Sequence, residues 1–320
     1  MMHTGENKKP RVLGIVGATA SGKTALSLNI AESLGCEILC MDSMQVYKRM
    51  DIGTAKPTAA EQARVPHHLL DLVEPADSFS VAEYVSAAHA VIQQILSRGR
   101  IPLLVGGTGL YLQGLSLPLD YGGLPSNPAI RAELQQQLDQ DGADAMHAKL
   151  SAIDPQSAAR LHPNDTRRVI RALEIYRLTG VPMSGHRVPS AADSPYDFQL
   201  YAIDWPRPEL HRRINLRVDQ MMQEGLLNEV KGLLRSGITA EMQSMQGLGY
   251  KELIPVIQQN ASLDNAIEQI KTGTRNYARR QLIWFRRDKR IRWIAAEQLS
   301  CAKEMIINNW EDPAAWISTL

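Results

Sequence analysis

The sequence is poor in cysteine and has no long hydrophobic run. Its three cysteines, Cys36, Cys40 and Cys301, are too few and too scattered for a disulfide framework, which favours a reducing compartment such as the cytoplasm. Cys36 and Cys40 have no second pair elsewhere to complete a metal site, so we interpret them as small buried side chains. The N-terminal segment "MMHTGENKKPRVLGIVG" contains only a brief apolar run, which predicts neither a signal peptide nor a membrane span.

An excess of one charge is also missing. The 35 Lys and Arg residues nearly balance the 34 Asp and Glu residues, so the net charge is +1 and any basic surface must be local. Hydrophobic residues make up 44% and charged residues 22% of the chain, as in ordinary soluble globular proteins. A chain of 320 residues is long enough for one or two domains.

Strands and helices are predicted to alternate in the first third of the chain. Continuous apolar runs indicate strands buried on both faces of a parallel sheet, and segments with helical spacing lie between them. The predicted strands are 11–17, 37–41 and 101–107, and the predicted helices are 24–34 and 80–99. This order predicts an α/β fold: a doubly wound, mostly parallel sheet core of the P-loop type.

The composition changes after about residue 119. The turn-rich string "DYGGLPSNP" is followed by short polar helical segments and by a loop-like stretch rich in Pro, Ser and Gly. An apolar strand pattern returns at "FQLYAIDWP". We therefore predict a core of residues 1–120 and 196–320, with a helical insertion domain at 121–195. In the second part of the core we expect one long helix, apolar from Ile214 to Val230, and a last long helix over about 263–287.

The string "GATASGKT" matches the phosphate-loop pattern G-x-x-x-x-G-K-[ST]. It follows a predicted strand and opens a predicted helix, which is the context that the motif requires. Backbone N–H groups of such a loop point at an anion, a lysine adds charge, and a threonine hydroxyl can hold Mg²⁺. The pattern is typical of ATP-binding and other nucleotide-binding proteins, but it specifies a diphosphate and not an adenine. The candidate residues are Gly17, Ala18, Thr19, Ala20, Ser21, Gly22, Lys23 and Thr24.

Asp42 ends the second predicted strand, in "MDSMQVY". Ligands of open α/β sheets bind at the carboxyl ends of the strands, so Asp42 is expected close to the bound phosphates. Three roles are open for it: a ligand of Mg²⁺, a general base for an acceptor nucleophile, or the N-cap of a helix.

The third predicted strand ends in "GGTG" rather than in an acidic residue. Its glycines allow close backbone approach, and Thr108 offers a hydroxyl group. The guanine signature N-K-x-D is absent, which argues against a GTPase. A kinase is still compatible with these motifs.

The motifs together resemble those of the tRNA dimethylallyltransferase family, also called tRNA isopentenyltransferases. They are "GATASGKT", "DSMQVYKRMDIGTAKP", "VPHHLLD", "IPLLVGGTGLYL", "HPND", "RRVIRALEIY" and "GLGYKE", and they follow the family order from about residue 12 onwards. The resemblance implies transfer of a dimethylallyl group from dimethylallyl diphosphate to the exocyclic 6-amino group of the adenine immediately 3′ of the anticodon. The tail has one cysteine and no histidine, so the zinc finger of eukaryotic members is not expected here.

The resemblance also assigns roles to residues. The loop and Lys23 would hold the diphosphate of the prenyl donor, with Mg²⁺ at Thr24, and Arg217 would reach the same diphosphate. Asp42 would take the proton of the adenine amino group, and Thr108 would hold that group from the other side. Arg213 lies one helical turn before Arg217, and we interpret it as solvated surface.

Recognition of tRNA would involve the insertion and the C-terminal helices. The string "RNYARRQLIWFRRDKRIRW" is locally basic with interleaved aromatic residues, which is typical of phosphate-backbone binding. The extruded adenine would enter a channel between core and insertion. Besides Asp42 and Thr108, the candidate tRNA-binding residues are Ser43, Met44, Gln45, Arg131, Arg167, Arg168, Val169, Ile170, Arg171, Gln246, Gly247, Leu248, Gly249, Tyr250, Lys251, Arg279, Arg280, Gln281 and Arg286.

Five side chains receive plain structural interpretations. We expect Trp284 and Phe285 to pack in the core and Lys56 to be exposed, while His67 and His68 point to opposite faces of a strand rather than to one metal. We expect a cytoplasmic monomer. One rival function is a small-molecule or nucleotide kinase, which leaves the basic string unexplained. The other is an RNA-binding module with a relict loop, and the intact Lys23 and Thr24 together with Asp42 and Thr108 argue against it.

Overall fold

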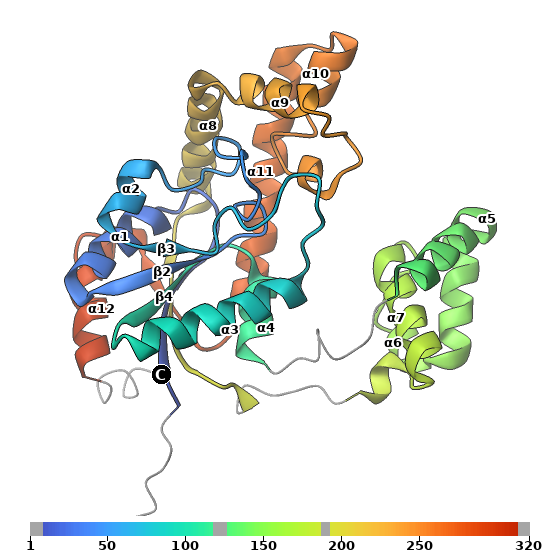
Figure 1. Cartoon of the computed structure of the whole chain (residues 1–320), viewed down its shortest axis with the longest axis horizontal. Coiled ribbons are helices and arrows are strands. Elements are labelled where there is room, and N and C mark those ends of the chain that lie inside the picture. Colours follow the sequence, from blue (N-terminus) through green and yellow to red (C-terminus); the bar gives the residue numbers. More distant parts are fainter. Residues whose placement is uncertain (1–8, 118–126, 187–192, 313–320) are drawn as a thin grey trace, which may run out of the picture. The chain divides into compact units, whose positions relative to one another are not determined.

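The computed structural model describes residues 9–117, 127–186 and 193–312. The chain divides into two compact units, which are coloured by sequence in Figure 1: unit 1 comprises residues 1–116 and 194–320, and unit 2 comprises residues 117–193. The predicted insertion at 121–195 overlaps unit 2 over most of its length. Part of the predicted loop after residue 181 lies outside the described residues.

Unit 1 is built on a six-stranded sheet with the order β3-β2-β4-β1-β5-β6, and every strand pair in it is parallel. The sheet confirms the predicted α/β class. The strands are β1 (Arg11–Val16), β2 (Cys36–Met41), β3 (His67–His68), β4 (Ile101–Gly106), β5 (Asp197–Asp204) and β6 (Ile291–Ala295).

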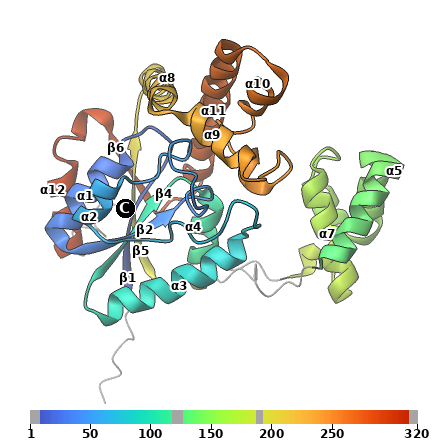
Figure 2. The ribbon, with the colours of Figure 1, turned by 45° about the horizontal axis from the view of Figure 1, so that its top comes forward.

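Helices cover both faces of this sheet because successive strand residues point to opposite sides. Val12 and Val16 of β1 pack with α3 (Val81–Ser97) and α4 (Gly109–Ser116), whereas Leu13 and Ile15 pack with α1 (Lys23–Leu34) and α12 (Ala302–Glu311). Figure 2 shows α1 and α12 on one side of the sheet and α3 on the other. Cys36 and Cys40 are buried at the α1 face, as predicted, and burial raises the pKa of both thiols.

The predicted single helix through Val230 is wrong. The helix α8 (Arg207–Glu224) ends at Gly225, whose φ of 103° no other residue adopts easily, and α9 (Leu226–Arg235) begins there. The apolar stripe continues across the break because both helices bury it against the same core, which hid the boundary. The remaining helices of unit 1 are α2 (Ala59–Arg64), α10 (Ile254–Gln259) and α11 (Leu263–Phe285).

Unit 2 has a core of its own. Its helices are α5 (Pro128–Ile153), α6 (Pro155–Ala158) and α7 (Thr166–Thr179), followed by a 3₁₀ turn at Met183–Gly185. Leu134, Met146 and Leu150 of α5 pack against Val169 and Leu173 of α7. This core lets the unit bury its apolar residues without help from unit 1.

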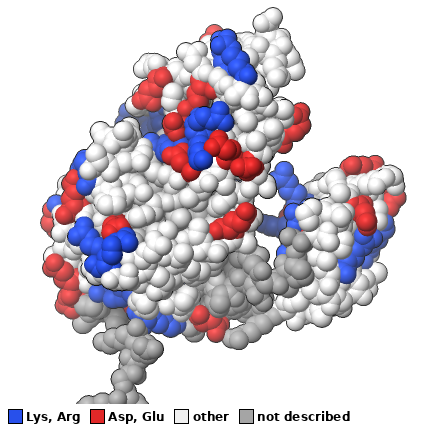
Figure 3. Space-filling model, in the orientation of Figure 1, with Lys and Arg blue, Asp and Glu red and all other residues white. Residues whose placement is uncertain are grey.

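The surface shows the charge balance expected from the composition. On the face in Figure 3, acidic and basic side chains are interspersed and form no field of a single sign. No helix in the described part of the chain is long and apolar enough to cross a lipid bilayer.

Candidate active site

The predicted site lies at one edge of the sheet, where three neighbouring strands end. The register pairs Val16 of β1 and Met41 of β2 with Gly106 of the intervening β4. The phosphate loop, Asp42 and Thr108 therefore leave the sheet side by side, at the carboxyl ends where ligands bind in this class of fold.

The phosphate loop has the backbone shape that anion binding requires. Gly17, Ala20 and Gly22 have φ values of 127°, 60° and 96°, and the positive value at Ala20 is costly for a residue with a side chain. Tertiary contacts support this shape: the Ala20 carbonyl accepts a hydrogen bond from Arg213 Nε (2.9 Å), and the Ser21 carbonyl accepts one from Trp205 Nε1 (2.8 Å). No acidic residue lies in the first turn of α1, so its N-terminus favours an anion.

Two cations face the space beside the loop. Lys23 Nζ donates a hydrogen bond to the Ala18 carbonyl (2.6 Å). Its burial and the charge of Arg217 lower the pKa of Lys23 to about 7, although Asp42 acts in the opposite direction. Burial also lowers the pKa of Arg217, which has no hydrogen bond or ion pair within residues 9–117, 127–186 and 193–312. A bound anion would relieve the cost of holding both charges here.

Asp42 and Thr108 are held next to each other. Asp42 Oδ1 accepts a hydrogen bond from the Met44 backbone N–H (2.8 Å), and Thr108 Oγ1 accepts one from the Ser43 N–H (3.1 Å). The Asp42 carboxylate is not the N-cap of any helix in the described ranges, since no helix begins in residues 43–46 there. Tyr277 of α11 lies on the same side, and burial together with the Asp42 charge raises the pKa of its phenol.

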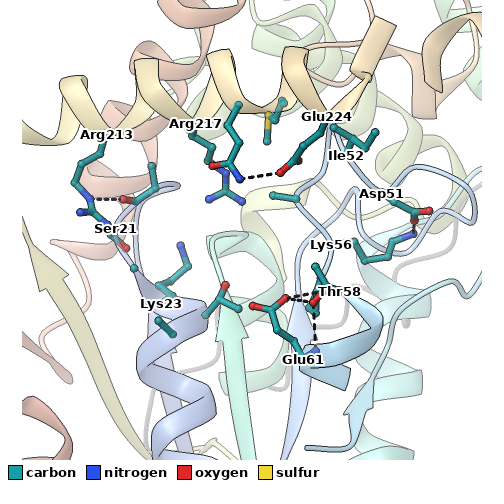
Figure 4. Close-up of a pocket in the computed structure, with 18 of the residues that line it drawn as sticks. Ser21, Lys23, Asp51, Ile52, Lys56, Thr58, Glu61, Arg213, Arg217 and Glu224 are labelled. Atoms are coloured by element: carbon teal, nitrogen blue, oxygen red, sulfur yellow. Dashed lines mark hydrogen bonds and ion pairs between the residues drawn. The ribbon is translucent and has the colours of Figure 1, made fainter. Parts of the chain in front are cut away.

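Two cavities adjoin the loop. The smaller, of about 90 Å³, is lined by Lys23, Thr24, Asp42, Arg217 and Tyr277 among others. The larger, of about 850 Å³, opens between the loop, the 51–62 segment and α8, and Figure 4 shows Arg217 pointing from α8 into the cavity that Lys23 enters from α1. Both cavities share Lys23, Thr24 and Arg217. A phosphate group at the loop would therefore be reached from both.

The structure allows one test of the expected Mg²⁺. The Thr24 side chain borders both cavities, where its hydroxyl is the kind of oxygen ligand that Mg²⁺ takes. The described residues contain no group of three His, Cys, Asp or Glu side chains that could hold a metal by themselves. This donor set fits an ion that is held mainly by a substrate's phosphates and by water, which is the usual arrangement for Mg²⁺.

Two structural interpretations from the sequence are wrong. Arg213 is not a solvated surface residue: besides binding the Ala20 carbonyl, its guanidinium stacks over Trp205, 4.4 Å from the ring centroid. Lys56 is buried, and its Nζ donates to the Tyr47 carbonyl and to the carboxylates of Asp51 and Asp71. Both side chains hold segments around the cavities in place.

The two adjacent aromatic residues at the end of α11, Trp284 and Phe285, differ in burial. Phe285 is buried as predicted, but Trp284 is 36% exposed, so the prediction of core packing for Trp284 is wrong. Its ring lies so close to Gly109 that a side chain there would overlap it. His67 and His68 have different partners, the Val65 carbonyl and Glu37, which agrees with opposite faces of a strand.

The candidate tRNA-binding residues of unit 2 differ in their surroundings: some form ion pairs, one is exposed and two are buried. Arg131 and Arg171 form ion pairs with the fully buried carboxylate of Glu174. Arg168 pairs with Asp165, while Arg167 is exposed. The side chains of Val169 and Ile170 are buried in the core of the unit.

The candidate tRNA-binding residues of unit 1 also differ in how accessible their side chains are. The Gln45 amide donates to the Thr54 and Ala55 carbonyls, and Gln246 donates to the Ala240 carbonyl. Tyr250 is buried with its hydroxyl on Glu229 (2.7 Å). Gly249 is buried too, whereas Met44, Gly247 and Leu248 are half-buried and Lys251 is exposed.

Of the basic candidates near the C-terminus, Arg279 and Arg280 are exposed on α11, and Arg286, which directly follows this helix, is also exposed. Arg286 pairs with Asp204 (3.1 Å), and Arg280 lies over the Tyr277 ring at 5.8 Å. Gln281, by contrast, is buried at the cavity. Sequence reasoning missed Tyr277 as a site residue, although its place one turn before Gln281 is the signal that could have found it.

The fold and the site together define an α/β enzyme of the P-loop type. Comparisons with known proteins narrow this class. A family model described as IPP transferase matches residues 45–288, and one described as isopentenyl transferase matches residues 10–72. The chain therefore belongs to the tRNA dimethylallyltransferase family of prenyltransferases.

Individual relatives support this assignment over most of the chain. The tRNA dimethylallyltransferase of Pelotomaculum thermopropionicum is 45% identical over 92% of this chain and 94% of its own, and that of Bacillus subtilis is 47% identical over 90% and 91%. The solved tRNA isopentenylpyrophosphate transferase of Bacillus halodurans is 42% identical, with a TM-score of 0.71 and coverage of 96% and 99%. A eukaryotic dimethylallyltransferase solved while acting on tRNA is 28% identical, with a TM-score of 0.81 and coverage of 96% and 80%.

Proposed function

We propose that the protein transfers a dimethylallyl group from dimethylallyl diphosphate to the 6-amino group of the adenine immediately 3′ of the anticodon in tRNA. The observation that carries this proposal is the meeting of two unlike halves at one small cavity. Lys23, Thr24 and Arg217 line this cavity as the half that would bind an anionic substrate. Asp42 lines the same cavity, and the backbone of its neighbour Ser43 is hydrogen-bonded to Thr108. The family assignment supplies the substrates that fit the two halves.

The loop half would bind the leaving group. When the bond between the first carbon of the donor and its diphosphate oxygen breaks, negative charge grows on the diphosphate. The loop N–H groups, Lys23 and Arg217 are already oriented to stabilise this charge, so little reorganisation is needed. Mg²⁺ bound at Thr24 would supply further charge neutralisation to the diphosphate.

The carboxylate half would handle the acceptor. As the adenine nitrogen forms its bond to carbon, it must lose a proton, and Asp42 is the carboxylate next to that position in this arrangement. Its second oxygen has no hydrogen-bond partner within the described residues, because only Oδ1 accepts from Met44. We assign Asp42 as the general base and Thr108 as the second group that orients the amine.

The kinase alternative is not favoured. A kinase would share the loop, but the matched families and relatives are prenyltransferases. The cytoplasmic location, the monomeric state and the binding of dimethylallyl diphosphate itself stay predictions.

One assay tests the proposal. The protein is incubated with labelled dimethylallyl diphosphate, Mg²⁺ and unmodified tRNA, and label is measured in the RNA. Lys23→Ala should lower transfer by roughly a hundredfold or more, as for other anion-stabilising groups, and leave tRNA affinity unchanged. Absence of label with the wild-type protein would refute the function, and an equal loss of tRNA affinity in the variant would refute the assignment of the loop to the donor.

A further inference from the structure

Helix α11 sends two side chains into the small cavity. Tyr277 and Gln281 lie one helical turn apart and both line it, together with Lys23, Asp42 and Arg217. Gln281 is only 5% exposed, which is unusual for a glutamine on a helix with basic residues on its outer surface. A buried amide needs hydrogen-bond partners, and those of Gln281 are informative.

The Gln281 amide connects the two halves of the site. Its Oε1 accepts a hydrogen bond from the backbone N–H of Thr19 in the phosphate loop (2.9 Å). Its Nε2 donates to the carbonyl of Gly107, which directly precedes Thr108 (2.9 Å). One planar group thereby bridges the donor loop and the strand end that carries the acceptor side.

Gly107, whose carbonyl accepts the hydrogen bond from Gln281 Nε2, packs closely against the Gln281 amide. A β-carbon at Gly107 would overlap Gln281 Nε2 and would also lie 3.1 Å from the Gly17 carbonyl. Only a glycine lets the amide approach the Gly107 backbone in this way. Gly107 and Gln281 are therefore complementary, and a change in either displaces the same contact.

We propose that Gln281 is a positioning residue for prenyl transfer, and not a contact to tRNA as the sequence suggested. It sets the separation between the diphosphate loop and the Asp42–Thr108 side of the cavity. The inference rests on the proposed function, because it concerns the distance between two reacting partners. Displacement reactions need their reacting atoms within about 3–3.5 Å, and a misplacement of about 1 Å can cost about a hundredfold in rate.

The decisive variant is Gln281→Met, which keeps the length of the side chain and removes both hydrogen bonds. We expect the single-turnover rate at saturating donor and tRNA to fall by roughly 10- to 100-fold, with a tRNA Kd within about twofold of wild type. Gln199→Met is the matched control: Gln199 is also a buried glutamine of unit 1, on β5, and it lines neither of the two cavities. Gln199 Nε2 makes only one long hydrogen bond, to the Asn309 carbonyl (3.5 Å), and its Oε1 is unpaired within the described residues, so the control should lose less stability than Gln281→Met. It should retain its transfer rate.

Two results would overturn the inference. A raised tRNA Kd with a normal rate at saturation would make Gln281 an RNA contact. A rate equal to that of Gln199→Met would make it a structural residue only. In either case the wild-type protein would still label tRNA, so these failures differ from a failure of the proposed function.

The single variant Gly107→Ala covers the case in which Gln281→Met does not fold, and a double-mutant cycle then tests the contact itself. Gly107→Ala perturbs the amide from the opposite side while Gln281 is intact. Gly107→Ala should lower the rate at least tenfold in the wild-type background. Combined with Gln281→Ala, it should lower the rate by less than about threefold, because the overlap with Nε2 is then gone and only the 3.1 Å approach to the Gly17 carbonyl is left. Additive effects of the two changes would refute the proposed contact.

Discussion

Replacing Asp42 with asparagine should separate its structural contribution from its chemical one. In the structure, Asp42 Oδ1 accepts the Met44 N–H at 2.8 Å, and the asparagine carbonyl oxygen can accept the same bond. The free energy of unfolding should therefore change by less than about 1 kcal/mol. For a protein of this size, that corresponds to a shift in Tm of no more than about 4 °C.

The chemical cost should be much larger. An amide cannot take the proton that the adenine amino group releases, so transfer should fall by about 10²–10⁴-fold. This corresponds to about 3–5 kcal/mol in the activation free energy. The assay is single-turnover transfer at saturating labelled donor and tRNA. Saturation matters because Asp42 raises the pKa of Lys23, and the variant will hold Lys23 in its neutral form more often and bind the donor less tightly.

Asp42→Ala provides the matched comparison. It removes the charge and also the acceptor for the Met44 N–H, so it should lose about 1 kcal/mol more stability than Asp42→Asn, with a similar loss of transfer. Transfer by Asp42→Asn within about threefold of wild type, at saturation of both substrates, would refute the role of Asp42 as the base. Restoration of that activity by added Mg²⁺ would instead make Asp42 a group that serves the metal.

Other parts of the structure make three further predictions. Because the pKa of Lys23 is about 7 before the donor binds and a bound diphosphate favours its charged form, donor affinity should fall as pH rises from 7 to 9. Calorimetry in buffers of different ionisation enthalpy should then record net proton uptake on donor binding at pH 8, and Lys23→Arg, whose charge is permanent, should lose this uptake. Lys56→Met should lower the free energy of unfolding in urea by about 1–3 kcal/mol, since it removes the hydrogen bonds of a buried ammonium group to the Tyr47 carbonyl and to two exposed carboxylates. Lys48→Met, which breaks a pair exposed on both sides, should cost under about 1 kcal/mol, and equal losses would contradict this. Arg279→Ala should reduce the slope of log tRNA affinity against log salt by about one unit, while Arg64→Ala, whose side chain is paired with Glu32, should leave it unchanged.

Local patterns were sufficient to predict the elements that surround the phosphate loop. The motif requires a strand before it and a helix after it, and β1 and α1 confirm both. The short β6 was not predicted because "IRWIA" mixes polar and apolar residues, and it becomes a strand only by pairing with β5. The break at Gly225 was missed for a related reason, since the burial of two helices against one core imitates a single apolar stripe.

The site was predictable where function depends on a motif and not where it depends on tertiary contacts. Asp42 and Thr108 could be placed together because parallel strands bring their carboxyl ends to one edge. The contacts of Arg213 to Ala20 and of Gln281 to Thr19 join segments far apart in the sequence, and no periodicity reports them. Lys56 was misjudged because its burial depends on carboxylates that fold over it.

The position of β1 in the middle of the sheet has a consequence for synthesis on the ribosome. One neighbour, β4, follows within the first third of the chain, but the other, β5, pairs Arg11 with Asp197 and is made only after the whole of unit 2. At a synthesis rate of about 5–20 residues per second, the edge of β1 that pairs with β5 stays unpaired for roughly 10–40 s. Unpaired strand edges invite association with other chains, so the nascent protein should depend on chaperones during this interval. Unit 2, whose core draws on residues close together in the sequence, can fold in this interval, before β5 and β6 complete the sheet of unit 1.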